Sequence, residues 1–534
     1  MNPRFSRSLF FLIVFLAFCG ALGALFSRSA GAQSDSDQST LRDSLKQFTN
    51  VYSVVEQNYA EPLTTDRVDA AIYDSAIPNM LHVLDPHSNF FDPKAFAQMK
   101  IEQRGKYYGV GMQIMQQGDK VVVVAPFAGT PSYKAGIRPG DVILAINGKS
   151  ATKMTSIDVA NTLKGPKGTP VEITIGREGA PKPIVFNLVR DEIPRNSVDL
   201  AFDIRPGIGY IHITNFQETT GHEVADALHK IGAMQGLVLD LRGNPGGLLS
   251  QAVSVAGDFL QKGQVIVSQK GRSFPEQIYR AQYTNTSDTF PIVVLVNRGT
   301  ASAAEIVSGA LQDHDRGLIA GETTFGKGLV QTVYPLSEAT GLALTTYHYY
   351  TPSGRLIQRN YNGVSLYDYY YNHNDTPQND ANREVKLTDA GRTVYGGGGI
   401  TPDVKIDTPK SNHFQDVLLQ HLVFFDFAKS YLANRTITSD FKVDDAVLKD
   451  FKQFLTKQQV PYTDQDINGV RDWIDMSIKS ELVTSQFDQQ EGLKIRAEWD
   501  PMINKAITLM PQALALEDTA KKTLAMKTSA QTHP

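Results

Sequence analysis

Cysteine is almost absent from this 534-residue sequence, and its only instance, Cys19, lies in an apolar segment near the N-terminus. The rest of the chain therefore has no disulfide bond, no cysteine nucleophile and no thiolate metal site, and we expect no metal and no other cofactor. An exported protein without disulfides is compatible with a bacterial cell envelope. It differs from small extracellular domains, which depend on disulfides for stability.

A surplus of positive charge is also lacking. The chain has 52 Lys and Arg residues against 56 Asp and Glu residues, which gives a formal net charge of −4. Because nucleic-acid-binding proteins usually carry a basic surplus, we expect no nucleic-acid partner. Hydrophobic residues make up 41% and charged residues 20% of the sequence, which is typical of a folded protein. The length predicts two to four domains.

The N-terminus has the order of a secretory signal. Arg4 and Arg7 precede an apolar run over 9–26, and the small residues Ala30-Gly31-Ala32 follow. This order predicts a cleaved signal peptide and a mature chain that begins at Gln33. One alternative is an uncleaved anchor in the inner membrane, because the 18-residue run is just long enough to span a bilayer. Another is lipidation at Cys19, although the bulky Phe18 before it fits poorly beside a lipidated cysteine. All three outcomes predict a periplasmic or other extracytoplasmic location.

The pattern of apolar residues changes along the chain and predicts a multidomain α/β protein. A helical region is followed by a β-rich module, then by strands that alternate with helices around a largely parallel sheet, and finally by more helices. The expected segments are the signal peptide or anchor over 1–32, an N-terminal helical region over 33–100, the β-rich module over 101–190, the α/β core over 191–410 and a C-terminal helical region over 411–534. Expected strands include 142–146, 171–175, 237–241 and 291–296, and expected helices include 155–163, 248–260 and 301–312.

Ser302 lies in the segment Gly299-Thr300-Ala301-Ser302-Ala303-Ala304-Glu305, between a predicted strand and a predicted helix. A serine at this point is near the positive end of the helix and is surrounded by unpaired backbone N–H groups. Its small neighbours allow a substrate backbone to approach. Taken alone, the same pattern also describes an ordinary N-cap serine.

Lys327 lies between Gly326 and Gly328 in a stretch that is otherwise apolar and neutral. A lysine that acts as a base must be neutral, so its pKa has to fall from about 10.4 toward 7–8. Burial among apolar groups lowers the pKa in this way, and the flanking glycines permit close approach. Taken alone, the segment also describes a solvent-exposed turn.

A third segment, Asp240-Leu241-Arg242-Gly243-Asn244-Pro245-Gly246-Gly247, ends one predicted strand and precedes a helix. Such a turn presents backbone N–H groups to an anion, as an oxyanion hole requires. It lacks the Gly-Lys-Ser/Thr ending of a phosphate-binding P-loop. Taken alone, it is equally a plain turn between a strand and a helix.

Together and in this order, the three segments resemble the carboxy-terminal processing, or tail-specific, serine proteases. Lys327 follows Ser302 by 25 residues, and Gln331 follows Lys327 by four. The resemblance begins near Leu84-Asp85-Pro86-His87-Ser88, includes Tyr350-Thr351-Pro352-Ser353-Gly354-Arg355, and ends near Gly399-Ile400-Thr401-Pro402-Asp403. It departs from the family pattern at Gly243, where Asn is usual, and at Ala304, where Ser is common.

The resemblance implies a crotonase-like β/α protease core with an inserted PDZ module. Ser302 is then the nucleophile, Lys327 is the base, and the amides of Gly247 and Ala303 form the oxyanion hole. Gln331 is implied to orient the lysine. Because four residues of a straight strand span about 13 Å, this last role requires a bend near Gly328.

The β-rich module contains Gly109-Val110-Gly111-Met112, which resembles the carboxylate-binding loop of PDZ domains. A peptide would add as a strand beside 112–115, and the loop would hold its C-terminal carboxylate. The expected partners are therefore proteins or peptides with exposed C-termini, such as envelope proteins, and the chain itself is a candidate homo-oligomer.

Two other functions remain open at this point. A catalytically inert PDZ scaffold would bind without cleaving, and a serine hydrolase with a Ser-His triad would use His87 or His348, although no local feature selects either. His314, in Asp313-His314-Asp315, is expected at a solvated helix end rather than at a metal site, because adjacent side chains do not converge on one ion.

Overall fold

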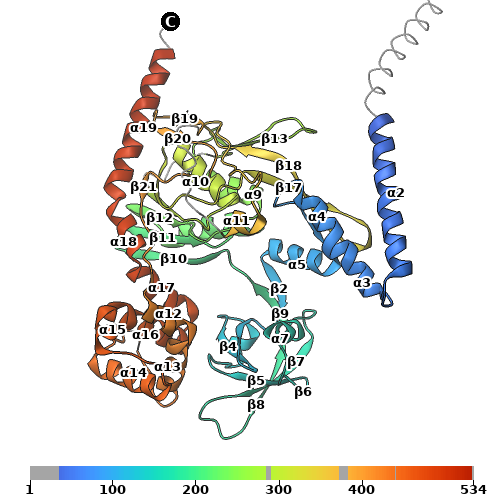
Figure 1. Ribbon diagram of the computed structural model, residues 1–534. Coiled ribbons are helices and arrows are strands. Elements are labelled where there is room, and N and C mark those ends of the chain that lie inside the picture. Colours follow the sequence, from blue (N-terminus) through green and yellow to red (C-terminus); the bar gives the residue numbers. More distant parts are fainter. Residues whose placement is uncertain (1–34, 284–289, 372–382, 439, 532–534) are drawn as a thin grey trace, which may run out of the picture. The chain divides into compact units, whose positions relative to one another are not determined.

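The computed structural model describes residues 35–283, 290–371, 383–438 and 440–531 (Figure 1). The chain divides into two compact units, Met1–Met80 and Leu81–Pro534. The predicted signal or anchor over 1–32 lies outside the described residues. Within the described ranges, no helix is both long enough and apolar enough to cross a membrane.

The first unit is helical, as its three-and-four spacing of apolar residues predicts. Helix α2 (Asp35–Asn58) is followed by α3 (Thr65–Asp69) and by a π-helical segment over Ala70–Ala76 that continues into α4 (Ile77–His82). Apolar side chains of α2 such as Leu45 and Phe48 are more than half exposed, at 58% and 53%.

The second unit is built on a six-stranded sheet in the order β10-β11-β12-β15-β16-β21. Its first pair is antiparallel, and the other strands are parallel, as the alternation of strands and helices predicts. The strands are β10 (Val198–Arg205), β11 (Ile208–Ile213), β12 (Gly236–Asp240), β15 (Ile292–Val296), β16 (Gly317–Gly321) and β21 (Val404–Lys405). Both β12 and β15 are completely buried, which explains their continuous apolar runs.

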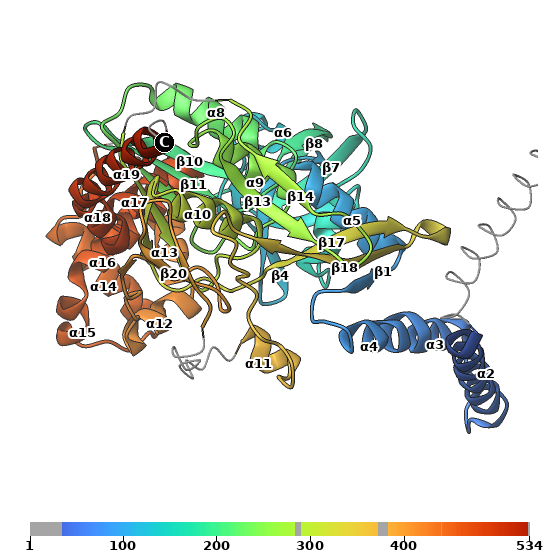
Figure 2. The same ribbon diagram turned by 90° about the horizontal axis from the view of Figure 1, so that it is seen from above.

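Helices cover both faces of this sheet. Since successive side chains of a strand point to opposite faces, each strand contributes to two cores. Leu237 and Leu239 belong to a core shared with α8 (Thr220–Ile231), α9 (Leu249–Gly257) and α10 (Ala303–Asp313). Val238, between them, faces the opposite core, which α18 (Pro501–Thr508) and α19 (Met510–Gln531) complete (Figures 1 and 2). Helix α19 continues to Gln531.

A second sheet has the order β1-β18-β13-β14, and β17 also pairs with β18. Its strands are β1 (Asn89–Phe91), β13 (Val265–Lys270), β14 (Gln277–Arg280), β17 (Leu329–Pro335) and β18 (Gly341–Tyr350). The loop that carries Lys327 lies directly before β17. A short helix, α11 (Leu366–Tyr370), follows β18 along the chain.

The β-rich module has its own core and a sheet in the order β3-β4-β5-β7-β8. Its elements are β3 (Met112–Gln117), β4 (Lys120–Pro126), β5 (Val142–Ile146), β7 (Pro170–Gly176), β8 (Ile184–Val189) and helix α7 (Ser156–Leu163). A two-stranded ladder of β2 (Lys106–Gly109) and β9 (Asp191–Pro194) lies where the chain enters and leaves the module.

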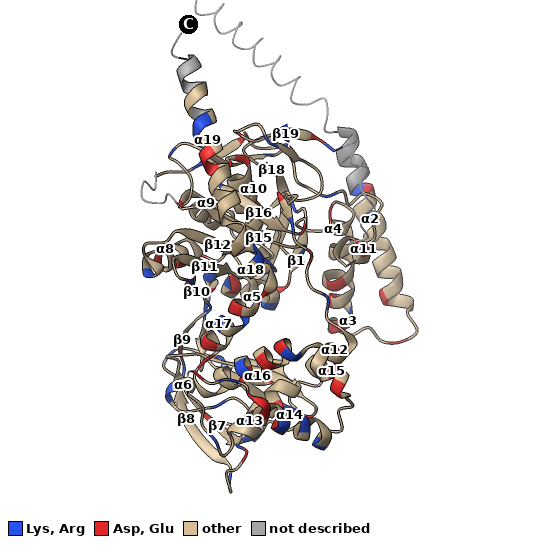
Figure 3. Ribbon diagram, turned by 90° about the vertical axis from the view of Figure 1, so that its left-hand side faces the viewer, with Lys and Arg blue, Asp and Glu red and all other residues tan. Residues whose placement is uncertain are grey.

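The C-terminal region is helical and forms a separate apolar core. Its helices are α12 (His413–Gln420), α13 (Val423–Leu432), α14 (Asp445–Lys457), α15 (Asp464–Gly469), α16 (Arg471–Gln486) and α17 (Gln489–Trp499). Charges of both signs follow one another along α14 and α16 (Figure 3). The predicted multidomain α/β architecture is therefore confirmed.

Candidate active site

Ser302 lies at the N-cap of α10, in the turn that follows the buried strand β15. Its backbone has φ 56° and ψ −115°, a conformation that non-glycine residues rarely adopt. Such strain is retained where surrounding contacts fix it, and it is common at catalytic turns. A Cβ atom built on Gly246 would lie 2.7 Å from Cβ of Ser302, so the glycine loop approaches this turn closely.

Glu305, one turn into α10, is completely buried and joins the serine turn to the lysine loop. Its Oε2 accepts the backbone N–H of Ser302 at 2.7 Å and that of Lys327 at 2.9 Å. Its Oε1 accepts the N–H of Gly326 at 2.7 Å and the hydroxyl of Thr324. Burial raises the pKa of Glu305 to about 7, although these donors act in the opposite direction.

Lys327 is half-buried, and desolvation lowers the pKa of its ammonium group from 10.5. The carboxylates of Glu305 and Asp85 act against this shift without cancelling it. In the described part of the chain, Lys327 has no ion-pair partner within 4.0 Å. The lysine environment therefore has the property that a base requires at neutral to alkaline pH.

The segment 241–247 forms a turn that is held from several sides. Asn244 is buried, and its side-chain amide donates to the carbonyl of Ile213 at 2.8 Å, while its backbone carbonyl accepts the N–H of Ala301 at 2.9 Å. Among the described residues, neither the N–H of Gly247 nor that of Ala303 has a hydrogen-bond acceptor. Two backbone donors beside the serine turn are therefore free to bind an oxyanion.

The two residues that depart from the family pattern, Gly243 and Ala304, both fit their local backbone and packing. Gly243 has φ 69°, in the left-handed region that glycine and asparagine tolerate best, which explains why either residue fits there. Ala304 is fully buried within α10, where it contributes to the core. Neither position carries a reacting group.

Gln331 lies on β17, where the pairing with β18 shifts register between Val330 and Gln331. Its side-chain amide donates to the hydroxyl of Thr345 at 3.1 Å. Among the described residues it makes no hydrogen bond to Lys327. The orienting role of Gln331 therefore remains a prediction.

His87 is close enough to the site for the charge of Lys327 to affect its pKa, but both of its ring nitrogens already contact tyrosine hydroxyls. Nε2 is 3.0 Å from the hydroxyl of Tyr369, and Nδ1 is 3.2 Å from that of Tyr370. Burial, and the charge of Lys327, lower the pKa of His87 to about 3. An imidazole with so low a pKa is a weak proton acceptor.

The other two histidines lie elsewhere. His348 is exposed on β18 and forms part of the strand ladder. His314 is not solvated, and that prediction is wrong: Nδ1 lies 2.7 Å from Asp389, Nε2 lies 2.7 Å from the carbonyl of Val265, and only 8% of the side chain is exposed. In the described ranges, no group of three or more His, Cys, Asp or Glu residues could hold a metal.

In the β-rich module, Gly109-Val110-Gly111-Met112 connects β2 to β3, and β3 is an edge strand of the sheet. The carbonyls of Val110 and Gly111 accept hydrogen bonds from Ser132 and Thr130 at 2.7 and 2.8 Å. The N–H groups of Val110 and Gly111 have no acceptor among the described residues. The loop is thus fixed through its carbonyls, and its donors remain available beside an open strand edge.

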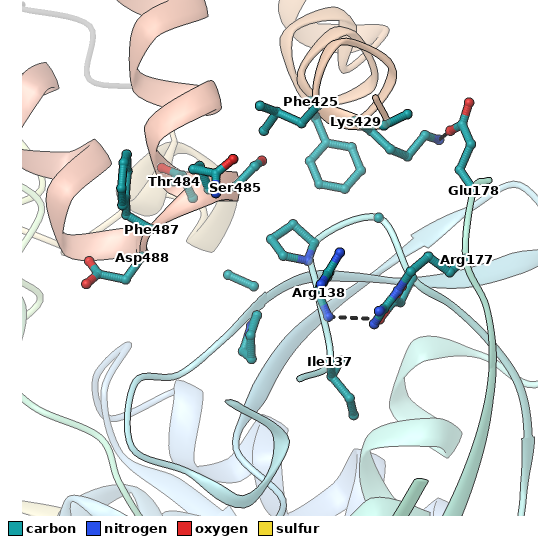
Figure 4. Close-up of a pocket in the computed structure, with 18 of the residues that line it drawn as sticks. Ile137, Arg138, Arg177, Glu178, Phe425, Lys429, Thr484, Ser485, Phe487 and Asp488 are labelled. Carbon is teal, nitrogen blue, oxygen red and sulfur yellow. Dashed lines mark hydrogen bonds and ion pairs between the residues drawn. The ribbon is translucent and has the colours of Figure 1, made fainter. Parts of the chain in front are cut away.

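The β-rich module contacts the C-terminal helical region through a few polar groups. Lys429 of α13 lies 3.7 Å from Glu178, and the amide of Gln117 donates to Asp426 at 3.1 Å. Between the two regions is a cavity of about 430 Å³. Its lining includes Lys429, Glu178 and Phe425, which are labelled in Figure 4. These contacts are sparse compared with the apolar cores on either side.

Two carboxylates near the site were missed by the sequence analysis. Glu305 falls three residues after an N-cap serine, a spacing that by itself indicates an ordinary capping box. Asp85 accepts the backbone N–H groups of His87 and Ser88, both at 2.8 Å, and this resembles a common turn in sequence. Only the fold brings either carboxylate toward Lys327.

Comparison with known proteins matches three segments of the chain. The model of Peptidase family S41 matches residues 207–365, a PDZ domain model matches 122–177, and a model of the C-terminal helical domain of a probable PDZ-protease matches 414–466. The carboxy-terminal-processing protease of Bartonella bacilliformis is 38% identical over 354 residues, which cover 65% of this chain and 80% of that protein.

Two further proteins are similar over comparable lengths. The carboxy-terminal processing protease CtpA of Bacillus subtilis is 32% identical over 391 residues, covering 72% of this chain and 82% of that protein. Among solved structures, the photosystem II D1 C-terminal processing protease is 34% identical, with a TM-score of 0.34, and the match covers 67% of this chain and 86% of that one.

Proposed function

Since the chain belongs to peptidase family S41, the carboxy-terminal processing serine proteases, we propose that it cleaves peptide bonds with Ser302 as nucleophile and Lys327 as base. The observation that carries this proposal is the shared carboxylate of Glu305, because it binds the backbone of both residues and keeps them in adjacent loops. The lowered pKa of Lys327 supports its role as a proton acceptor.

In the proposed reaction, neutral Lys327 accepts the hydroxyl proton of Ser302 as Oγ attacks the scissile carbonyl. The free N–H groups of Gly247 and Ala303 stabilise the negative oxygen of the tetrahedral intermediate. The lysine then returns its proton to the departing amine, which leaves an acyl-enzyme on Ser302. Water, deprotonated by the same lysine, attacks the ester, and the lysine then gives this proton to Oγ of Ser302 as the new carboxyl terminus leaves. Gln331 is proposed to orient Lys327 through the bulge in β17.

The test of this proposal is hydrolysis of an unfolded protein such as casein by wild type and by Ser302→Ala. We expect the variant to lose activity while its thermal unfolding stays close to wild type. A matched control is Ser308→Ala on the same helix, whose hydroxyl donates to the backbone carbonyls of Ala304 at 3.0 Å and Glu305 at 3.5 Å. Hydrolysis by Ser302→Ala at the wild-type rate would refute the assignment of the nucleophile.

We further propose that the PDZ domain selects substrates by their free C-termini. The available N–H groups of Val110 and Gly111 support this role, as does the open edge of β3, along which a peptide strand can add. Substrates would then be proteins of the bacterial envelope, reached after export of the chain. N-terminal sequencing of the mature protein tests the export step, with Gln33 as the expected first residue and Met1 as the result for an uncleaved membrane anchor.

We also propose that the protein self-associates. The exposed apolar side chains of α2, including Leu45, Phe48 and Val51, support an interface between copies of the chain. Light scattering coupled to size exclusion tests this: Leu45→Asp with Phe48→Asp should reduce the mass of the assembly. A wild-type mass equal to that of one chain would refute self-association.

A further inference from the structure

The segment 489–531 lies outside the three matched family segments, yet it touches the loop of the proposed oxyanion hole. Helices α18 and α19 bury Ile503, Ala506 and Met510 against the face of the protease sheet that Val238 and Leu295 supply. The C-terminal helices thus complete the core of the catalytic domain rather than forming an appendage to it.

The contact with the loop is an ion-pair relay that begins at the end of β12. Asp240 is 1% exposed, and its carboxylate accepts the hydroxyl of Tyr210 at 2.8 Å and Nη2 of Arg242 at 2.6 Å. The guanidinium then uses its other edge, with Nη1 donating to Oδ2 of Asp500 at 3.0 Å. A planar guanidinium can bind a different carboxylate on each of two edges, a geometry that the compact ammonium group of a lysine does not reproduce.

Asp500 divides its two oxygens between the loop and a helix. Its Oδ1 caps α18 by accepting the N–H groups of Met502 and Ile503 at 2.7 and 3.1 Å. Its Oδ2 binds Arg242, and the two side chains are only 27% and 16% exposed. Since solvent screens such a pair weakly, loss of the Asp500 charge leaves the guanidinium short of a partner.

Arg242 is positioned to transmit this effect to both donors of the oxyanion hole. Its neighbour Gly243 donates a backbone N–H to Oδ1 of Asn297 at 2.8 Å, and the same oxygen accepts the N–H of Gly299 at 3.0 Å. The loop that continues to Gly247 is therefore bound, beside Arg242, to the turn that continues to Ala303.

We propose that Asp500 is a positioning residue for the oxyanion hole, acting through Arg242, so that the C-terminal helices set the rate of the chemical step. This inference rests on the proposed function of Gly247 and Ala303. It predicts that an altered Asp500 lowers kcat and leaves substrate affinity almost unchanged, because an oxyanion forms only in the transition state.

The test uses Asp500→Asn in the full chain. Asparagine is as good an N-cap as aspartate, so α18 remains capped while the charge that faces Arg242 is lost. The matched control is Asp444→Asn, because Asp444 caps α14 by accepting the N–H of Val447 at 2.9 Å, but α14 belongs to the separate core of the C-terminal helices, away from the protease sheet. With a fluorogenic peptide, we expect kcat of Asp500→Asn to fall about tenfold, with KM and the unfolding temperature close to those of the control.

A double-variant cycle separates positioning from general destabilisation. Arg242→Lys should also lower kcat, and adding Asp500→Asn should then cause little further loss, because the relay is already broken. Full additivity, or an unchanged kcat in Asp500→Asn, would overturn the inference while wild type remains active. A wild-type enzyme that hydrolyses nothing would instead overturn the proposed function, and this inference with it.

Discussion

Ser302 and Lys327, 25 residues apart in the sequence, donate their backbone N–H groups to one oxygen atom, Oε2 of Glu305. The carboxylate is completely buried, so it fixes the two loops in a medium where hydrogen bonds are not replaced by water. These two hydrogen bonds from the backbones of Ser302 and Lys327 to Glu305 do not use either side chain. Glu305 thus fixes the backbone positions of the proposed nucleophile and the proposed base relative to each other.

The first prediction concerns Glu305→Gln. The carboxylate accepts four donors, whereas an amide has one oxygen and an NH₂ group that would face donors, so at least two buried groups lose their partner. We expect the free energy of unfolding, measured with urea, to fall by about 2–5 kcal/mol, and activity to fall with it. Glu491→Gln is the control, since Glu491 holds the same third position of α17 but is exposed. Equal stability of the two variants would contradict the role of Glu305.

The second prediction concerns the pH dependence of hydrolysis. The pKa of Lys327 is lowered from 10.5 by desolvation, and the neutral amine appears as pH rises through that lowered value. We expect kcat/KM to rise with pH and then to remain high. Both Lys327→Arg and Lys327→Ala should lose at least about a hundredfold in activity, because neither supplies a neutral amine.

The same profile distinguishes the lysine from a histidine base. With a pKa of about 3, His87 is neutral across the working range, so a His87 base would give a rate that does not change between pH 5 and pH 9. His87→Ala and His348→Ala are the informative variants. Substantial turnover by Lys327→Ala, combined with loss of activity in a histidine variant, would refute the Ser/Lys dyad.

The third prediction is the effect of Lys327 on stability. Because its pKa is lowered in the native state, the unfolded state binds more protons between the lowered value and 10.5. The contribution of this lysine to stability is therefore greatest at high pH and is lost as pH falls through that window. Lys327→Met should be more stable than wild type at neutral pH, and this advantage should shrink in alkaline buffer. Urea unfolding at several pH values measures it, and a constant difference would contradict it.

Individual strands and helices could be predicted from the sequence where the local pattern of apolar residues was sufficient to define them. The strand expected over 142–146 is β5 (Val142–Ile146), and the buried strand expected over 291–296 is β15 (Ile292–Val296). The family and the α/β fold class are confirmed by the matched segments. Helix α10 was expected from residue 301 and begins at Ala303, because the strained turn at Ser302 delays the first helical residue.

The connections between distant segments could not be predicted in the same way. Glu305 looks like half of a capping box until the loop over 324–327 folds onto it, and no local pattern encodes that approach. His314 looks solvated because Asp389 and Val265, its partners, are remote in sequence. A single sequence gives spacing and polarity, whereas these contacts depend on how whole layers pack.

The fourth prediction tests the approach of the glycine loop to the nucleophile. Gly246 has φ 99°, and an added Cβ would lie 2.7 Å from Cβ of Ser302, so Gly246→Ala should displace the loop and reduce kcat by at least about a hundredfold. Gly243→Asn is the control. It lies in the same loop with φ 69° and has no atom within 4 Å of the added Cβ. Similar kcat values for the two variants would show that the loop tolerates the displacement.

The last prediction concerns the PDZ domain, and it compares a peptide acid with its amide. The free N–H groups of the Gly109–Met112 loop predict that a peptide with an apolar C-terminal residue and a free carboxylate binds more tightly than the same peptide as an amide. We expect at least about a tenfold difference in Kd by calorimetry, because charge-assisted hydrogen bonds to the carboxylate are lost in the amide. Equal affinities would remove this loop as the carboxylate site.

Two matched glycine variants test whether the difference in Kd between the peptide acid and the amide arises in this loop. A Cβ on Gly111 would overlap Thr130, whereas a Cβ on Gly118 would meet nothing within 4 Å, although both residues have positive φ, of 77° and 62°. Gly111→Ala should therefore weaken binding of the peptide acid toward that of the amide, while Gly118→Ala, which has the same kind of backbone strain without the overlap, should retain the preference. If Gly111→Ala kept the full preference for the acid, the carboxylate would have to bind elsewhere on the domain. Ser302→Ala is used as the background for all of these titrations, so that no peptide is cleaved during the measurement.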